Sequence, residues 1–218
     1  MRIAILLYDG MTALDAIGPY DVLRQVPGAE VLFVGDGAGV KRTEEQPLGL
    51  VADRTLAEVP HADVLVVPGG FGQERVMREP PTLDWIRRLH ATTQWTTSVC
   101  TGSLILAAAG LLHGLRATTH WASLERLRDF GAEPVAERVV EQGKIITAAG
   151  VSAGIDMALR LVARVAGDDM ARGIQLGIEY DPAPPFDAGS PRKAPEHVVQ
   201  LVRQAVEFKR ARYRSSVG

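Results

Sequence analysis

Short, uninterrupted aliphatic runs are the feature of this sequence that most restricts its fold. Residues 2–8 read Arg-Ile-Ala-Ile-Leu-Leu-Tyr, residues 30–34 read Glu-Val-Leu-Phe-Val, and residues 62–67 read Ala-Asp-Val-Leu-Val-Val. Each run ends where glycine or proline follows within a few residues, as in Pro68-Gly69-Gly70. Such runs are typical of strands buried on both faces, as in a parallel sheet covered by helices.

Helical periodicity separates and follows these runs. The alternation of strands with helices predicts an α/β fold with a mostly parallel central sheet and helices on both faces. A further strand is expected at 95–99, and a β-hairpin is expected around Gln142-Gly143. The predicted helices are a stripe from Leu14 to Leu23 in which Pro19 is the expected entry or break, 81–91, 103–109, 152–165 with Ser152 as its cap, 168–180 and 196–213.

Composition fits one folded domain over residues 1–218. Hydrophobic residues make up 46% and charged residues 23%, which excludes a disordered chain. Residues 181–195 carry five prolines and are predicted to be a loop. The helix at 196–213 is too small to fold alone, so it should pack back on the domain or reach a partner subunit.

Charge and hydropathy exclude two classes of partner. The net charge of −2 gives no basic excess for nucleic acid, and the basic run 209–214 is interpreted as a solvated helix end. No apolar run reaches the ~18 residues that a membrane span needs, and the first aliphatic run is too short for a signal peptide. We therefore expect a cytoplasmic protein with no membrane or nucleic-acid partner.

Cys100 is the strongest candidate for chemistry. It is the only cysteine, so no intrachain disulfide can form. It lies between a predicted strand and a predicted helix, with Gly102 two residues later, which is the pattern of a nucleophile elbow. A helix N-terminus there is expected to lower the thiol pKa. The alternative is a small buried residue at the end of a strand.

Other side chains near predicted strand ends could assist a thiol. Asp15 lies in an apolar stretch and should titrate high or pair with another group, unless it only caps a helix. The amides of Gly69, Gly70 and Thr101 could form an anion hole, although Pro-Gly-Gly could also be a simple tight turn. His120 is the best-placed proton partner, or else a structural histidine. Asp156 is expected to make a structural hydrogen bond. The sequence lacks motifs for zinc, a P-loop or a dinucleotide.

Five motifs in order resemble the ThiJ/PfpI superfamily. They are Leu14-Asp15-Ala-Ile-Gly18-Pro19, Val67-Pro68-Gly69-Gly70, Ser98-Val99-Cys100-Thr101-Gly102-Ser103, Ala117-Thr-Thr-His120-Trp121 and Gly150-Val-Ser-Ala-Gly154-Ile-Asp156. That superfamily has a flavodoxin-like α/β fold with a nucleophile-elbow cysteine. Within it, these motifs and residues 178–190 are most similar to isocyanide hydratases.

The resemblance implies a cysteine enzyme that adds water to an isocyanide and gives an N-substituted formamide through a thioimidate. Cys100 would be the nucleophile, Asp15 would contact it and handle protons, and Thr101 would offer its hydroxyl and amide. Gly70, Thr101 and His120 would bind the substrate or its developing charge. No cofactor and no metal are implied, and a homodimer with its pockets near the interface is implied.

Other readings stay open. The family's peptidases have histidine directly after the cysteine, where this chain has Thr101, and its glyoxalase-like members have glutamate in place of Asp15. Some AraC-type regulators carry the same motifs in a ligand-sensing or oligomerisation domain, followed by a DNA-binding domain that is not found before Gly218. Cys100 could also be a redox-sensing thiol. The sequence leaves open the R group of the substrate and the protonation state of the Asp15–Cys100 pair.

Overall fold

A seven-stranded sheet forms the centre of the protein. The computed structural model describes residues 1–44 and 48–215. The strand order is β10-β11-β7-β6-β1-β2-β5, and all neighbours are parallel except β10 and β11. The strands are β1 (Arg2–Leu6), β2 (Glu30–Gly35), β5 (Arg54–Thr55), β6 (Val64–Val67), β7 (Trp95–Val99), β10 (Val139–Gln142) and β11 (Ile145–Ala148). The mostly parallel sheet and the hairpin at Gln142-Gly143 are confirmed.

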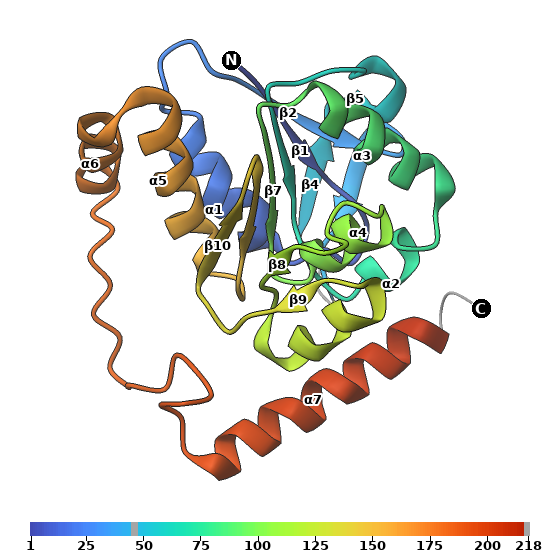
Figure 1. Ribbon diagram of the computed structural model, residues 1–218, viewed down its shortest axis with the longest axis vertical. Helices are drawn as coiled ribbons and strands as arrows, with labels where there is room; N and C mark the ends of the chain where they lie inside the picture. The colour runs from blue at the N-terminus through green and yellow to red at the C-terminus, as the bar shows by residue number, and fades with distance from the viewer. Residues whose placement is uncertain (45–47, 216–218) are drawn as a thin grey trace.

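Helices cover both faces of this sheet, as predicted (Figure 1). One face carries α1 (Ala13–Leu23), α5 (Ala153–Ala166) and α6 (Asp168–Gly177), and the other carries α2 (Gln73–Val76), α3 (Pro80–Thr92) and α4 (Gly102–Ala108). Because both faces are covered, the side chains of β6 are all buried, which explains its continuous aliphatic sequence.

Smaller elements complete the chain. They are the hairpin of β3 (Gly39–Arg42) and β4 (Gly49–Ala52), the pair β8 (Arg116–Ala117) and β9 (Glu133–Pro134), and the 3₁₀ segments η1 (Leu56–Glu58) and η2 (Trp121–Phe130). The β3–β4 hairpin and α2 were not among the predicted elements. None of the described helices is long and apolar enough to cross a membrane.

Two local predictions were wrong. Pro19 neither begins nor breaks a helix but lies inside α1. Packing holds this helix together, because Pro19 is buried and its neighbour Gly18 lets Ile155 of α5 approach closely. Ser152 occupies the N-cap position of α5 without a capping hydrogen bond, and its hydroxyl instead accepts one from Arg138 at 3.4 Å.

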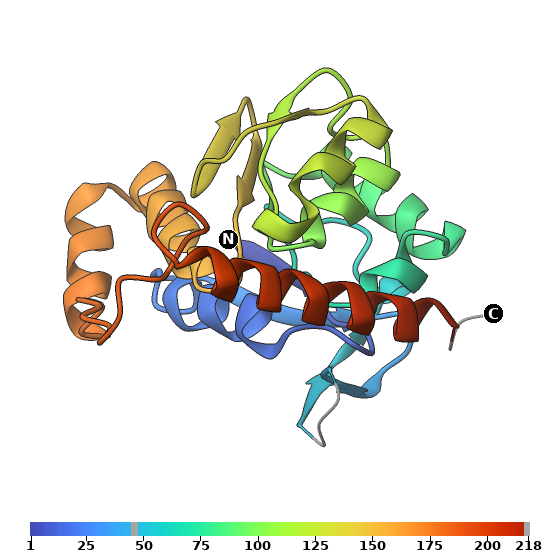
Figure 2. The ribbon, with the colours of Figure 1, turned by 90° about the horizontal axis from the view of Figure 1, so that it is seen from below.

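The proline-rich segment 181–195 is a loop, as predicted, and leads to α7 (Glu196–Ser215). Figure 2 shows α7 crossing the molecule from the side of α5 toward α2. It packs back on its own chain, because Arg210 donates a 2.8 Å hydrogen bond to Ser123 of η2. The predicted helix is thereby placed over the loops that follow β6 and β7.

Gly102 sets how closely α4 approaches the end of β6. A Cβ atom there would collide with the backbone oxygens of Val67 and Pro68, which cannot rotate away. We expect Gly102→Ala to lower the free energy of unfolding by about 1–3 kcal/mol, measured by urea denaturation. Gly173→Ala in α6 is the control, because nothing lies within 4 Å of its Cβ position and alanine favours a helix. Equal stability of the two variants would contradict this account.

Candidate active site

The candidate site lies where three neighbouring parallel strands end. Asp15 lies in the first turn of α1, which follows β1, while the loops after β6 and β7 carry Gly69-Gly70 and Cys100-Thr101, and these three strands are adjacent in the sheet. The segments that follow β1 and β6 are joined by a 2.9 Å hydrogen bond from the Thr12 N–H to the Gly69 carbonyl. Residues far apart in the sequence therefore meet at the carboxyl edge of the sheet, which is where α/β folds place their sites.

Cys100 has the backbone of a nucleophile elbow. Its φ is +55°, in the left-handed region that non-glycine residues rarely occupy. Its N–H donates to the carbonyls of Ala148 and Ala149 at 3.1 and 2.9 Å, and its carbonyl accepts from the hydroxyls of Ser103 and Thr119 at 3.2 and 2.9 Å. These bonds from three segments hold the strained conformation in place.

Asp15 lies fully buried beside this cysteine. Its Oδ2 accepts a 2.9 Å hydrogen bond from the Gly69 N–H, while no described N–H or O–H reaches Oδ1. Burial raises the pKa of Asp15 to about 7, and the nearby charge of Glu44 raises it too, whereas the Gly69 amide and a hydrogen bond from the Cys100 side chain lower it. The thiol is thus the neighbour placed to donate to the carboxyl. Asp15 was expected to titrate high or to pair with another group, and here its pKa is raised while its Oδ2 accepts a hydrogen bond from Gly69.

The sulfur is protonated at rest. Burial raises the pKa of the Cys100 thiol, and the charge of Asp15 raises it further, although the N–H groups of Val151 and Thr101 lower it by bonding to the sulfur. The prediction of a lowered thiol pKa was wrong. The free-energy cost of removing a thiolate from water exceeds the stabilisation that two N–H groups and the N-terminus of a short helix provide. The resting pair is therefore a neutral thiol beside a carboxyl that titrates near neutrality.

The glycine amides have other partners than the ones expected. The Gly69 N–H is held by Asp15, and the Gly70 N–H donates to the Thr101 hydroxyl at 2.9 Å. They therefore hold the side chains of Asp15 and Thr101 in place. Val151, which the sequence analysis did not single out as a donor, provides an amide to the sulfur from a strained backbone with φ of +35°.

A cavity of about 460 Å³ opens onto Cys100, Thr101, Gly70 and His120. His120 accepts a 3.3 Å hydrogen bond from the Ala122 N–H at Nδ1. Burial and the charge of Arg210 lower its pKa, so the imidazole is neutral near pH 7. The structure thus places the predicted site residues together, with His120 on the cavity wall. Asp156 lies apart from them in an ion pair with Arg138, as expected for a structural role.

Glu44 is a site residue that sequence reasoning missed. Its Oε1 accepts hydrogen bonds from the Thr12 hydroxyl and the Phe71 N–H, both at 2.9 Å. It lines the cavity, and its charge raises the pKa of both Asp15 and Cys100. No local pattern marks it, because its loop meets the site only in the fold. Within residues 1–44 and 48–215, no group of three or more His, Cys, Asp or Glu side chains is arranged to hold a metal ion.

Fold and site together define a family. Residues 1–164 match the DJ-1/PfpI family, and the chain belongs to it. The crystal structure of a ThiJ/PfpI family protein from Pseudomonas syringae superposes with a TM-score of 0.93 and 37% identity, covering 100% of this chain and 90% of that one.

Two curated relatives have named activities. An isonitrile hydratase of Pseudomonas putida is 47% identical over 204 residues, covering 94% of this chain and 89% of the relative. An HTH-type transcriptional regulator of Pseudomonas aeruginosa, CdhR, is 36% identical over 94 residues, covering 42% of this chain and 28% of the regulator. The family resemblance and the likeness to isonitrile (isocyanide) hydratase are thereby confirmed.

The raised pKa of Asp15 predicts a pH dependence of stability. Between about pH 4 and pH 7 the native carboxyl keeps a proton that the unfolded chain has lost, so stability falls as pH rises. We expect Asp15→Asn to remove this slope, gaining on the order of 3 kcal/mol relative to wild type between pH 5 and pH 8. Urea denaturation at both pH values measures it. Asp21→Asn, on the exposed side of the same helix, should keep the wild-type slope.

Proposed function

We propose that the protein is an isocyanide hydratase that converts R–N≡C and water into an N-substituted formamide. The observation that carries this proposal is the buried carboxyl of Asp15 beside Cys100, which lines a cavity. A neutral thiol beside a carboxyl suits an isocyanide, whose terminal carbon must gain both a nucleophile and a proton. The 47% identity to an isonitrile hydratase supports the same reaction.

In the first half of the proposed reaction, Asp15 takes the proton of the Cys100 thiol as the sulfur attacks the isocyanide carbon. A C–S bond forms, and the carbon retains an electron pair. Asp15 returns its proton to that carbon, which gives the thioimidate R–N=CH–S–Cys100. A carboxyl whose pKa is about 7 can both take and return this proton near neutral pH.

In the second half, water adds to the imidoyl carbon. Asp15 takes a proton from the water and passes it to the imidoyl nitrogen. The tetrahedral adduct then loses its hydroxyl proton as the C–S bond breaks, which releases R–NH–CHO and restores the thiol. In this scheme the N–H groups of Val151 and Thr101 stabilise the leaving thiolate, since both bond to the sulfur. The hydroxyl of Thr101 and the neutral imidazole of His120 bind the substrate end nearest the sulfur.

The proposal includes a small-molecule substrate and a homodimer, as the family resemblance implies, in the cytoplasm, as the hydropathy of the sequence predicts. The light-scattering mass of the purified protein reports the dimer. Ligand sensing is the second candidate function, favoured by the 36% identity to a segment of a transcriptional regulator. Redox sensing has less support, because the Cys100 thiol is buried and its pKa is raised.

Turnover separates hydratase from sensor. We expect the purified protein to convert cyclohexyl isocyanide to N-cyclohexylformamide, followed by chromatography, and Cys100→Ala to reduce the rate to background. A sensing domain would instead bind the isocyanide, shift its melting temperature and form no formamide. Absence of formamide across aliphatic and aromatic isocyanides would reject the hydratase.

The role of Asp15 as proton carrier predicts a pH profile. The carboxylate must be free to take the thiol proton, so kcat/KM should rise with pH and level off above about pH 7. Asp15→Asn cannot accept a proton, and we expect it to lose ~10²-fold or more of kcat at every pH. Asp21→Asn keeps full activity in this account, and an Asp15→Asn enzyme with near-normal kcat contradicts it.

A further inference from the structure

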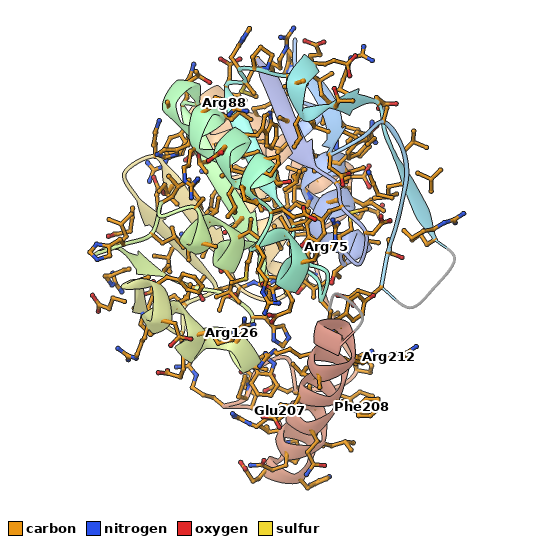
Figure 3. The ribbon with its side chains drawn as sticks, turned by 90° about the vertical axis from the view of Figure 1, so that its right-hand side faces the viewer. Arg75, Arg88, Arg126, Glu207, Phe208 and Arg212 are labelled. Atoms are coloured by element: carbon orange, nitrogen blue, oxygen red, sulfur yellow. The ribbon has the colours of Figure 1, made fainter. Side chains whose placement is uncertain are left out.

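One face of α7 forms a wall of the cavity above Cys100. The lining residues on this helix are Leu201, Val202, Ala205, Val206, Lys209 and Arg210. Their spacing repeats in steps of three and four residues, so they share one side of the helix. The side chain of Phe208, on another side of α7, points outward in Figure 3 and is 71% exposed.

Specific contacts hold this wall in place. Arg210 bonds to the Ser123 hydroxyl at 2.8 Å, and its Nε lies 3.9 Å from the buried carboxylate of Glu74. That carboxylate also pairs with Arg126 of η2 at 2.7 Å. Arg203 stacks over the Trp121 ring at 5.5 Å. The helix is therefore fixed to α2 and η2, the elements that flank the cavity.

The cavity has two chemically different ends. Cys100, Thr101 and His120 form the reactive end, whereas Val202, Ala205 and Val206 face it from α7. The isocyano group is only two atoms, so most of the roughly 460 Å³ is left for the R group. Val202 is still 38% exposed although it lines the cavity. An apolar R group in contact with it would therefore remove from water both its own apolar surface and that of Val202.

We propose that the α7 residues Val202, Ala205 and Val206 determine substrate specificity by contacting an uncharged, apolar R group of the isocyanide. This inference rests on the proposed function for the identity of the substrate. The wall itself follows from the cavity and the contacts of α7. A substrate that uses this wall has an R group large enough to span from the sulfur to α7.

Ala205→Phe tests this proposal by filling the cavity from the α7 side. We expect kcat/KM for cyclohexyl isocyanide to fall about tenfold or more and that for methyl isocyanide to change less than about threefold. Val206→Ala should shift the ratio the other way. Gln204→Phe is the matched control, because it adds the same side chain to an exposed position of α7 outside the cavity lining.

A second measurement is independent of hydratase activity. Cys100 is the only thiol, so mass spectrometry of intact protein gives its rates of alkylation by N-ethylmaleimide and N-cyclohexylmaleimide. Ala205→Phe should slow the cyclohexyl reagent selectively, by about fivefold or more relative to the ethyl reagent. Cys100→Ala should take up neither reagent.

The outcomes separate the two proposals. Unchanged ratios in Ala205→Phe, or an equal change in Gln204→Phe, overturn the α7 wall. A shifted maleimide ratio in a protein that hydrates no isocyanide supports the wall and rejects the hydratase. Shifts in both the hydration and the maleimide ratios support both.

Discussion

The proximity of one carboxyl and one thiol, both removed from water, is the constraint on which the site depends. Asp15 and Cys100 could not both be charged in this position without a large electrostatic cost: burial raises the pKa of each group, and the charge of Asp15 raises that of the thiol further. Groups coupled this closely titrate as a pair, so their pKa values belong to the pair. This is a costly arrangement for stability and a useful one for chemistry, because a proton can leave the sulfur without leaving the site.

Backbone geometry makes that proximity attainable. A left-handed Cys100 and a left-handed Val151 meet at the sulfur, the first by carrying it and the second by donating an N–H to it. Gly69 has no side chain because a Cβ there would collide with the Thr101 amide, and its own amide holds Asp15. Backbone strain is thus concentrated at a few residues, and the rigid strands around them hold these residues in their strained conformations.

Local sequence carried most of the fold and the centre of the site. Aliphatic runs in Ile3–Leu6 and Val64–Val67 predicted buried strands because burial on both faces leaves no room for polar residues. A strand, a cysteine and a glycine-led helix predicted the elbow, and an acid in an apolar stretch pointed to Asp15.

The remaining features depend on contacts that only the fold creates. The direction in which the thiol pKa shifts depends on how completely water is excluded from Cys100, and no neighbouring residue in the sequence reveals that. Glu44 reaches the site from a loop whose sequence carries no catalytic pattern, and the motif at 150–156 does not reveal that the N–H of Val151 donates to the sulfur. Pro19 was judged by its effect on an isolated helix, whereas packing against α5 decides its conformation. The cavity-facing side of α7 was likewise invisible, since an amphipathic pattern does not say what it faces.

The proline-rich loop at 181–195 has a consequence for how the substrate range of the proposed enzyme can change. It contains no regular secondary structure, and α7 contributes a cavity wall without belonging to the sheet. Mutations in α7 can therefore change the shape of the cavity without changing Cys100, Asp15 or the sheet that positions them. Under the two proposals, chemistry and selectivity are encoded in separable parts of the polypeptide, and a catalyst of this architecture acquires new substrates by changes in its final helix alone.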